Sequence, residues 1–311
     1  MSLAQLNVDQ IKPLLAPLAE QARKLIGQGK VADYIPALKQ VASNQFGVAV
    51  CDINGNVISF GDATTPFSIQ SISKLFTLVQ AIKIYDETLW EKIGKEPSGQ
   101  RFNSLVQLET DHGIPRNPFI NAGALAVCDR LESRLSAPNY QLIELLQKLA
   151  KNPFIKTNLK VARSELEHGS RNAAMAYLMK AFDNFANPVE KVLESYCHHC
   201  AIEMSCVDLA KATLFLANSG VDLNGDKILD RSQTVRINAL MATCGLYDAS
   251  GEFAFQVGLP GKSGVGGGIV AIHPKHFSIC VWSPELDEFG NSKAATEFLK
   301  ILTDELKISI Y

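Results

Sequence analysis

The chain has 311 residues, of which 47% are hydrophobic and 20% are charged, as is typical of a folded globular protein with a sizeable core. Its formal net charge of −2 gives no electrostatic basis for binding nucleic acid or an anionic membrane surface. We expect neither a signal peptide at residues 1–12 nor a membrane span, because no apolar run is long enough. Seven scattered cysteines then favour reduced thiols in a cytoplasm.

The first elements in chain order are a helix and a hairpin. Apolar residues recur at helical spacing over residues 9–27, which predicts a helix, and a turn with a short helix follows from Asp33. Residues 46–52 and 56–60 are rich in strand-forming side chains and flank Asn54-Gly55. This dipeptide between two such runs is the strongest short signal for a β-hairpin.

The middle of the chain, residues 67–249, is predicted to be mostly helical. Its glycines and prolines indicate loops at residues 96–99, 113–118 and 184–187. Ser205 and Asp208 form the pattern of an N-cap with an acidic residue three positions on. Helices are expected at residues 122–135, 140–150, 171–183, 188–196, 205–218 and 232–244.

After Gly251 the pattern becomes typical of strands, which we expect at residues 253–257, 268–272 and 277–282, before a last helix at 294–306. Strands near both chain ends, with helices between them, predict an α+β fold. Residues 1–66 and 250–311 would build one antiparallel sheet with flanking helices, and residues 67–249 an inserted helical subdomain, in one discontinuous domain. A binding site is expected in the cleft between the two parts.

One short motif at the start of the helical region carries candidate chemistry. Ser71 stands three residues before Lys74, and positions i and i+3 share a helix face. A serine hydroxyl becomes a nucleophile when a base takes its proton, and a lysine can be that base if burial lowers its pKa. The apolar residues that follow, such as Leu75 and Phe76, can supply the burial. The plainer alternative is a core helix whose lysine extends to solvent.

A second motif, Lys262-Ser263-Gly264, precedes a predicted strand. A Lys-Ser/Thr-Gly strand beside a Ser-x-x-Lys helix is the arrangement of serine β-lactamases and penicillin-binding proteins. Backbone N–H groups of the strand edge and of Ser71 could form an oxyanion hole for acyl transfer. The Ser-Asp-Asn motif of β-lactamases does not occur in the chain. A phosphate-loop interpretation of the following glycines lacks the strand–turn–helix unit that it needs.

Cys197-His198-His199-Cys200 resembles half of a zinc site. No second half-site stands at a suitable spacing, so we interpret the cluster as core packing and expect no metal.

Along nearly its whole length, from Lys30 to Asn291, the chain resembles the bacterial glutaminase family of the β-lactamase-like fold. The matching stretches occur in the same order and are long enough to be specific. They are residues 29–36, 67–74, 94–99, 102–103, 121–124, 164–165, 171–172, 244–247, 258–268, 282–284 and 290–292.

The resemblance implies hydrolysis of L-glutamine to L-glutamate and ammonia, without a cofactor, by a cytoplasmic homo-oligomer (a dimer or tetramer). It implies Ser71 as nucleophile, Lys74 as base and the Val265 N–H as a second oxyanion donor. Tyr34 or Tyr247 would relay a proton to the leaving ammonia. Glu165 would pair with the substrate's α-ammonium, and amide and phenol groups would hold its α-carboxylate. The positions that match the family's substrate site are Tyr34, Ser71, Asn121, Glu165, Asn172, Tyr196, Tyr247 and Val265.

Without the resemblance these residues have plainer interpretations. Glu165 would be a solvated charge, Tyr196 a core residue, and Asn121 and Asn172 helix-start residues. Two other functions are therefore weighed beside a glutaminase: a β-lactam hydrolase or D,D-peptidase, and a non-catalytic amino-acid-binding protein on the same scaffold. A nitrocefin assay tests the first, and ammonia release from glutamine tests the second.

Overall fold

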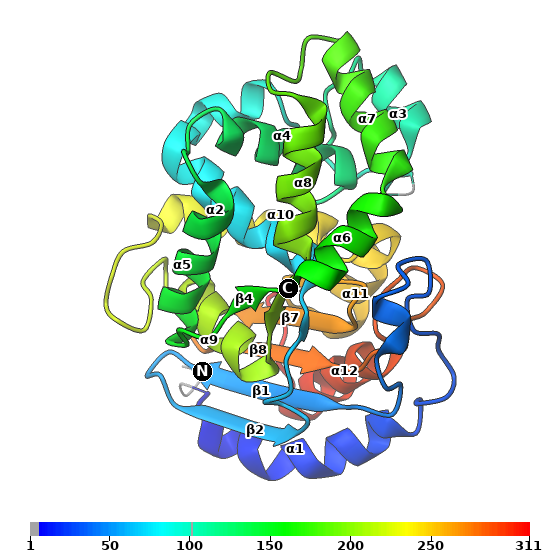
Figure 1. Cartoon of the computed structure of the whole chain (residues 1–311). Coiled ribbons are helices and arrows are strands. Elements are labelled where there is room, and N and C mark those ends of the chain that lie inside the picture. Colours follow the sequence, from blue (N-terminus) through cyan, green and yellow to red (C-terminus); the bar gives the residue numbers. More distant parts are fainter. Residues whose placement is uncertain (1–5, 101) are drawn as a thin grey trace.

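The computed structural model describes residues 6–100 and 102–311, and it is organised around a five-stranded antiparallel sheet. The strand order is β2-β1-β8-β7-β6, so strands from the two ends of the chain pair at its centre, where β1 lies beside β8. Figure 1 shows β1 and β2 near β8 and β7, with the helical region above them. The predicted sheet from both chain ends is confirmed. Its strands are β1 (Gly47–Asp52), β2 (Val57–Gly61), β6 (Gly261–Ser263), β7 (Gly268–His273) and β8 (Phe277–Trp282).

The predicted hairpin joins β1 to β2. Asp52 Oδ1 accepts hydrogen bonds from the N–H groups of Asn54 (3.0 Å) and Asn56 (2.9 Å). Gly55 takes a φ of +85°, which a glycine adopts without steric cost. This local chemistry explains why the sequence alone was sufficient to place the turn.

Helices cover both faces of the sheet. On one face, α1 (Val8–Arg23), α11 (Ser250–Val257) and α12 (Lys293–Leu306) share an apolar core with alternate strand residues such as Val48 and Ile279. On the other face α9 (Cys206–Ala217) packs across β1 and β8. All six residues of β1 are buried for this reason.

The remaining helices form the region inserted between β2 and β6. Their apolar core is continuous with the α9 face of the sheet, so the subdomain boundaries at residues 66 and 249 remain a prediction. These helices are α2 (Ser73–Tyr85), α3 (Leu105–Thr110), α4 (Asn121–Glu132), α5 (Pro138–Ala150), α6 (Leu159–Glu167), α7 (Ser170–Ala181), α8 (Val189–Cys200) and α10 (Arg231–Cys244).

Short elements connect these helices. A small sheet has the order β3-β5-β4. The elements are β3 (Phe67–Ser68), β4 (Lys156–Thr157), β5 (Ile202–Met204) and the 3₁₀ turns η1 (Leu38–Gln40), η2 (Gln70–Ile72), η3 (Asp86–Glu91) and η4 (Tyr247–Ala249).

The strand predicted at residues 253–257 is wrong, because this segment belongs to helix α11. Ser250, Phe253 and Val257 are buried at helical spacing, whereas Phe255 is 88% exposed. The helix ends at Gly258, whose φ of +69° is typical of a glycine C-cap. The other predicted helices are present with small shifts at their ends, and the predicted capping box of Ser205 and Asp208 begins α9. The short helices α3 and α6 were not predicted.

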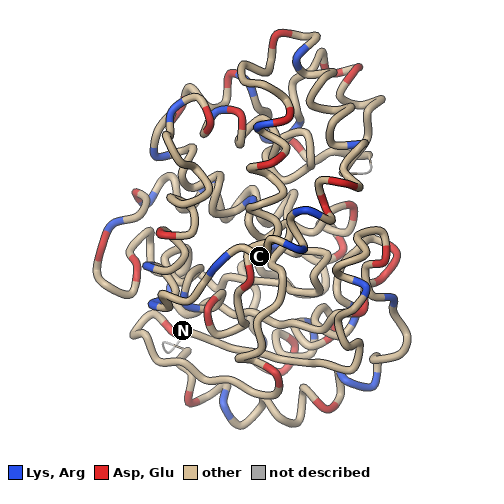
Figure 2. The backbone as a smooth tube through the Cα atoms, in the orientation of Figure 1, with Lys and Arg blue, Asp and Glu red and all other residues tan. Residues whose placement is uncertain are grey.

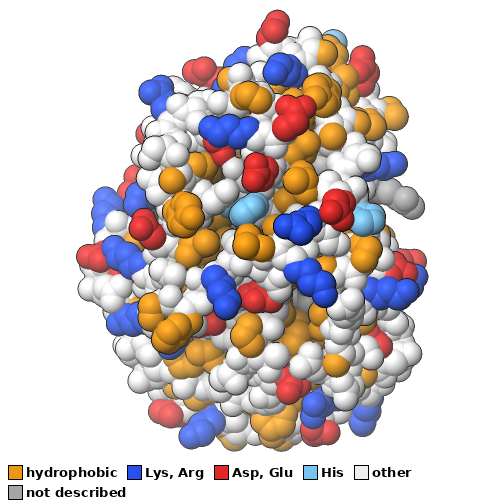
Figure 3. Space-filling model, viewed as in Figure 1, with side chains coloured by type: hydrophobic (Ala, Val, Ile, Leu, Met, Phe, Trp, Pro, Cys, Tyr) orange, Lys and Arg blue, Asp and Glu red, His pale blue; other side chains and the backbone are white. Residues whose placement is uncertain are grey.

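Charged residues of both signs are interspersed along the backbone (Figure 2) and over the face drawn in Figure 3, in keeping with the net charge of −2. Within residues 6–100 and 102–311, none of the helices is both long and apolar enough to cross a membrane.

Candidate active site

The two sequence motifs meet at the turn that carries Ser71. This residue lies in η2, between β3 and the first turn of α2, and is only 8% exposed. A Cβ atom on Gly264 would lie 2.5 Å from the Ile69 carbonyl oxygen and 3.2 Å from the Ser71 nitrogen. Glycine therefore allows the end of β6 to pack directly on the backbone of the Ser71 turn.

Lys74 is buried rather than extended to solvent, with 2% of its surface exposed. Its Nζ donates hydrogen bonds to the Phe119 carbonyl (3.1 Å) and to Asn121 Oδ1 (2.6 Å), and none is made to Ser71. Burial lowers the pKa of Lys74 to about 8, because a charged ammonium loses hydration in the interior. Roughly one Lys74 in eleven is therefore neutral at pH 7.

Lys262 is a second fully buried lysine on the same side of the site. Its Nζ donates to the carbonyl oxygens of Gly245 (3.1 Å) and Ser263 (2.7 Å) and lies 5.0 Å from the centre of the Tyr247 ring. Burial and the charge of Lys74 lower the pKa of Lys262 well below its usual value. We therefore do not expect Lys262 to act as a strong neighbouring cation that depresses the pKa of Lys74.

All the positions that the resemblance assigned to the substrate site line one cavity of about 230 Å³. Lys74, Lys262, Ser263 and Gly264 are not among the residues that line it. The assigned residues come from loops and helices far apart in the sequence, and the fold brings them together. They are Tyr34, Ser71, Asn121, Glu165, Asn172, Tyr196, Tyr247 and Val265.

Asn121, at the start of α4, connects the cavity wall to Lys74. Its Oδ1 accepts from Lys74, and the Tyr196 hydroxyl is 3.5 Å from the same oxygen. Its Nδ2 donates to Asn172 Oδ1 (3.0 Å) on α7. The two asparagines thus have fixed amide orientations within a network that reaches from the cavity to the buried amine.

Glu165 on α6 is a buried carboxyl group in the cavity wall, with 8% of its surface exposed. Burial raises its pKa to about 7, against the opposing effects of Gln70 and Lys74. Gln70 Nε2 lies 3.3 Å from Glu165 Oε2 and 2.9 Å from Ser68 Oγ, and donates to both. A cation bound beside this buried carboxyl group would favour its ionised form. The group is therefore suited to bind a cation.

Gln70 is a site residue that sequence reasoning missed. It lines the cavity and takes a φ of +48°, unusual for a residue other than glycine. Its only sequence signal is its place inside the matched stretch 67–74. Six further residues of the cavity lining had been given no role, and four of them lay in matched stretches: Ile35, Phe102, Asn103 and Arg171, with His168 and Gly169 outside them.

Two backbone N–H groups point to anion stabilisation. Across the part of the chain that the structure describes, no protein atom accepts a hydrogen bond from the N–H of Ser71 or of Val265. Both residues line the cavity, and Ser71 lies two residues before the start of α2. Unpaired N–H groups in such a place are suited to an oxyanion.

The two candidate tyrosines differ in their surroundings. Tyr34 is 56% exposed, whereas the Tyr247 hydroxyl is buried. Burial raises the pKa of Tyr247, while the neighbouring hydroxyls of Ser71 and Ser263 act in the opposite direction. Tyr247 therefore lies next to the candidate nucleophile, and its hydroxyl is protonated at neutral pH.

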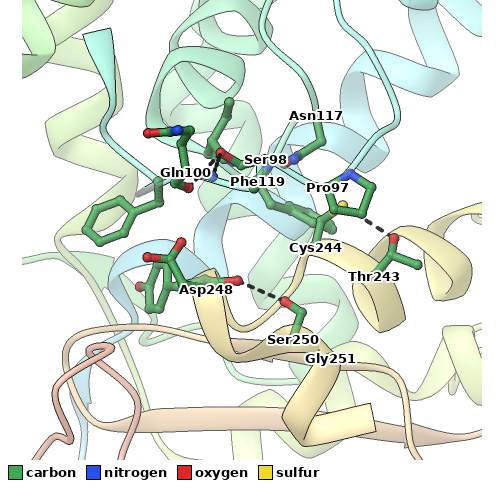
Figure 4. Close-up of a pocket in the computed structure, with 14 residues that line it drawn as sticks. Pro97, Ser98, Gln100, Asn117, Phe119, Thr243, Cys244, Asp248, Ser250 and Gly251 are labelled. Carbon is green, nitrogen blue, oxygen red and sulfur yellow. Dashed lines mark hydrogen bonds between the residues drawn. The ribbon is translucent and has the colours of Figure 1, made fainter. Parts of the chain in front are cut away.

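A second cavity of about 410 Å³ adjoins the first (Figure 4). The rings of Phe102 and Tyr247, whose centres are 4.8 Å apart, line both cavities and so form a partition between them. Ser98, Asn117 and Ser250 are among the polar residues around the second cavity.

The cysteine cluster at the end of α8 is buried. Cys197 and Cys200 are free thiols with at most 2% of their surface exposed, and His199 Nδ1 lies 3.6 Å from Cys128 Sγ. Among the described residues, no three His, Cys, Asp or Glu side chains gather in a group that could hold a metal ion. This arrangement agrees with the interpretation as core packing.

Comparisons with known proteins agree with this geometry. A model of the family described as glutaminase matches residues 29–311. The chain is 56% identical to a glutaminase of Shewanella loihica over 96% of this chain and 99% of that protein. It is 57% identical to a glutaminase of Aeromonas salmonicida, covering 96% and 98% of the two chains.

Solved structures show the same fold. A probable glutaminase named ybaS superposes with a TM-score of 0.88 at 32% identity, covering 96% of this chain and 98% of that one. A probable glutaminase of Bacillus subtilis, complexed with 6-diazo-5-oxo-L-norleucine, gives a TM-score of 0.88 at 31% identity, with 100% and 99% coverage. The match of the family over most of the chain, together with these relatives, shows that the chain belongs to the glutaminase family.

Proposed function

We propose that this glutaminase hydrolyses L-glutamine to L-glutamate and ammonia through an acyl-enzyme on Ser71, with Lys74 as general base. The observation that carries the proposal is the pairing of a serine in the cavity wall with a buried lysine one turn away, whose pKa is lowered to about 8. A serine nucleophile needs such a base near its hydroxyl.

The hydrogen bonds of Lys74 support its role as a base. A neutral amine has two N–H donors and one lone pair, and the carbonyl of Phe119 and the amide of Asn121 accept from both donors. The lone pair is then left for the Ser71 proton. The Ser71–Lys74 hydrogen bond need not be formed in the empty site, because catalytic hydrogen bonds often tighten only when substrate binds.

In the acylation step, Ser71 Oγ bonds to the side-chain amide carbon of glutamine and passes its proton to Lys74. The amide oxygen becomes an oxyanion, which accepts hydrogen bonds from the N–H groups of Ser71 and Val265. When the tetrahedral intermediate collapses, the C–N bond breaks and the nitrogen needs a proton to leave as ammonia. Water then attacks the acyl group and releases glutamate and free Ser71.

Tyr247 is the better candidate for delivering that proton. Its protonated hydroxyl is buried beside Ser71 and Ser263, whereas Tyr34 is mostly exposed at the cavity wall. Tyr247 recovers its proton from the water that attacks the acyl-enzyme, and Lys74 returns its proton to Ser71 Oγ as the acyl group leaves. Tyr34 is left with a role in contacting the bound substrate.

Glu165 is proposed to bind the α-ammonium of glutamine, because it is the buried acid of the cavity. Asn172, which Asn121 orients, offers an amide donor to the α-carboxylate, and the Tyr196 hydroxyl can exchange its 3.5 Å bond to Asn121 Oδ1 for one to the carboxylate. Free L-glutamine, with both charges, is therefore preferred to a glutamine residue within a peptide.

The nucleophile is tested with a glutamine analogue that forms a covalent adduct. One solved relative is titled as the covalent complex of the Bacillus subtilis glutaminase YbgJ formed by reaction with 6-diazo-5-oxo-L-norleucine. Mass spectrometry of this chain after the same treatment should place one adduct on the peptide that contains Ser71.

Ser71→Ala should form no adduct and lose turnover on the order of 10⁴-fold or more, with unchanged circular dichroism. Ser73→Ala, which removes a buried hydroxyl two residues away and outside the cavity, is the matched control and should keep both properties. A folded Ser71→Ala protein with more than about a tenth of wild-type ammonia release would refute the assignment.

The assembly and location remain proposals from the resemblance: a homo-oligomer, dimer or tetramer, in the cytoplasm. Light scattering of the purified protein tests the first, and cell fractionation tests the second.

A further inference from the structure

We propose that Ser250 and Asn291 are positioning residues that hold Tyr247 in a strained backbone conformation and thereby align its hydroxyl with Ser71. We call this pair the Tyr247 clamp. The inference rests on the proton-donor role proposed for Tyr247, and it adds two residues to which neither the resemblance nor the cavity lining assigns a catalytic role.

The strain lies at Tyr247 itself. Its φ is +52°, in the left-handed region that residues other than glycine or asparagine rarely adopt. Such a conformation is unfavourable and persists only when the surroundings enforce it. The surroundings must therefore supply specific contacts to the backbone on either side of Tyr247.

Two buried side chains supply those contacts. Ser250 Oγ donates to the Tyr247 carbonyl (3.1 Å) and accepts from the Leu246 N–H (3.0 Å), so one hydroxyl links the peptide group that follows Tyr247 to the one that precedes Leu246. Asn291 Nδ2 donates to the Leu246 carbonyl (3.3 Å). Ser250 is 5% exposed and Asn291 is 1% exposed. Figure 4 shows Ser250 with one of these bonds as a dashed line, at the floor of the second cavity.

Gly245, two residues before Tyr247, is packed too closely for the turn to change its conformation. Gly245 lies against the Gly261 carbonyl of β6 so closely that a Cβ atom could not fit. Lys262 Nζ and the Ser263 N–H both donate to the Gly245 carbonyl, at 3.1 and 3.2 Å. The chain is thus fixed to β6 on one side of Tyr247 and clamped by Ser250 on the other.

The clamp determines the position of the Tyr247 ring, whose hydroxyl faces the proposed reacting groups. The ring lies between Phe102 and Lys262 Nζ, and the hydroxyl lies beside Ser71 and Ser263. The loop that ends at Asn291 also contacts this ring, because a Cβ atom on Gly290 would lie 3.8 Å from Tyr247 Cε2 and 3.6 Å from Val265 Cγ1. Rotation of the turn would therefore move the proton donor away from Ser71.

A purely structural role would give different kinetics. Ser250 is also the first residue of α11, so its loss could simply destabilise that helix. A positioning role requires that Ser250 affects turnover only through the Tyr247 hydroxyl. A double-mutant cycle separates these two roles, because effects that act through one group are not additive.

The experiment measures kcat and KM for L-glutamine in wild type, Ser250→Ala, Tyr247→Phe and the double variant. We expect Ser250→Ala to lower kcat on the order of 10- to 100-fold, since a displacement of about 1 Å can cost as much, with KM changed less than about threefold. In the Tyr247→Phe background the same change should alter kcat less than about twofold. Ser250→Thr, which keeps the hydroxyl, should recover most of the loss.

Thermal denaturation and circular dichroism of each variant are measured in parallel. If Ser250→Ala does not fold, Ser250→Cys keeps a similar volume with a weaker donor and takes its place in the cycle. An equal fall of kcat in both backgrounds, or wild-type kcat in Ser250→Ala, would overturn the clamp. Full activity of Tyr247→Phe would instead refute the proposed proton donor, and the two failures are distinguishable.

Discussion

The pH dependence of kcat/KM is the sharpest test of the proposed chemistry, because two buried groups of the site titrate close to neutrality. With a pKa of about 8, roughly one Lys74 in eleven is neutral at pH 7. At the usual lysine value of 10.5 the neutral fraction would be about one in 3,000. Burial therefore increases the active fraction of the base by roughly 300-fold.

Glu165, with a pKa of about 7, adds a second requirement, because only its ionised form attracts the substrate's ammonium. Since kcat/KM reports the free enzyme, log kcat/KM should rise with a slope near 2 below about pH 7, near 1 from about 7 to 8, and level off above. The pH profile of kcat should not show the ionisation of Glu165, because the α-ammonium of bound substrate keeps the Glu165 carboxylate charged.

The assay is initial ammonia release between about pH 5.5 and 9.5 for wild type and three variants. In Glu165→Gln, log kcat/KM should rise with pH at a slope of 1 only. This rise should occur at lower pH than in wild type, because the charge of Glu165 raises the pKa of Lys74. Lys74→Arg should be nearly inactive, since a guanidinium does not release its proton. Glu167→Gln, an exposed acid on the same helix, is the control and should keep the wild-type profile. An active Lys74→Arg enzyme, or a slope of 2 that persists in Glu165→Gln, would contradict the assignment.

Three further predictions concern binding, the glycine contact and metal. Glu165→Gln should raise KM for L-glutamine roughly 10- to 150-fold, as expected for a charge-assisted hydrogen bond of about 1.5–3 kcal/mol; an unchanged KM would show that Glu165 does not contact substrate. Gly264→Ala should lower kcat on the order of 100-fold by displacing the Ser71 turn, whereas Gly251→Ala, with open space around it, should leave kcat unchanged. Similar kinetics of the two glycine variants would contradict the close packing. Dialysis against a strong chelator should leave activity unchanged, because the proposed steps use only side chains and backbone donors; a loss restored by zinc would count against them.

The sequence alone predicted the structural features that depend on residues close together in the chain. The Asn54-Gly55 hairpin, the capping box at Ser205 and the burial of the helix after Ser71 all depend on residues within one or two turns. The segment 253–257 failed because its apolar residues suit a strand as well as a helix. What decides between them is burial of Phe253 and Val257 against the sheet face, which is a tertiary effect.

The site itself was reached through the resemblance, and its energetics were not predictable. Nothing near Lys74 in the sequence indicates that Phe119 and Asn121, more than forty residues away, accept its hydrogen bonds. The raised pKa of Glu165 likewise depends on burial that α6 acquires only in the fold. Gln70 and Tyr247 are ordinary residues in the sequence, and only the backbone of the folded chain shows their positive φ angles.

These features lie together around one cavity, and each opposes folding. Lowering the pKa of Lys74 from 10.5 to about 8 corresponds to a cost on the order of 3 kcal/mol at neutral pH. The sign follows from linkage: the folded pKa lies below the unfolded one, so the cost is complete below about pH 8 and disappears as the pH rises toward 10.5. The strained backbones of Gln70 and Tyr247 add to this cost at every pH. Stability is typically only 5–15 kcal/mol, so the continuous core of α2, α4, α8 and α9 must offset these terms. A chain selected for stability alone would have no reason to keep two buried lysines and two strained residues beside one serine, and in the proposed mechanism they serve the reaction at Ser71.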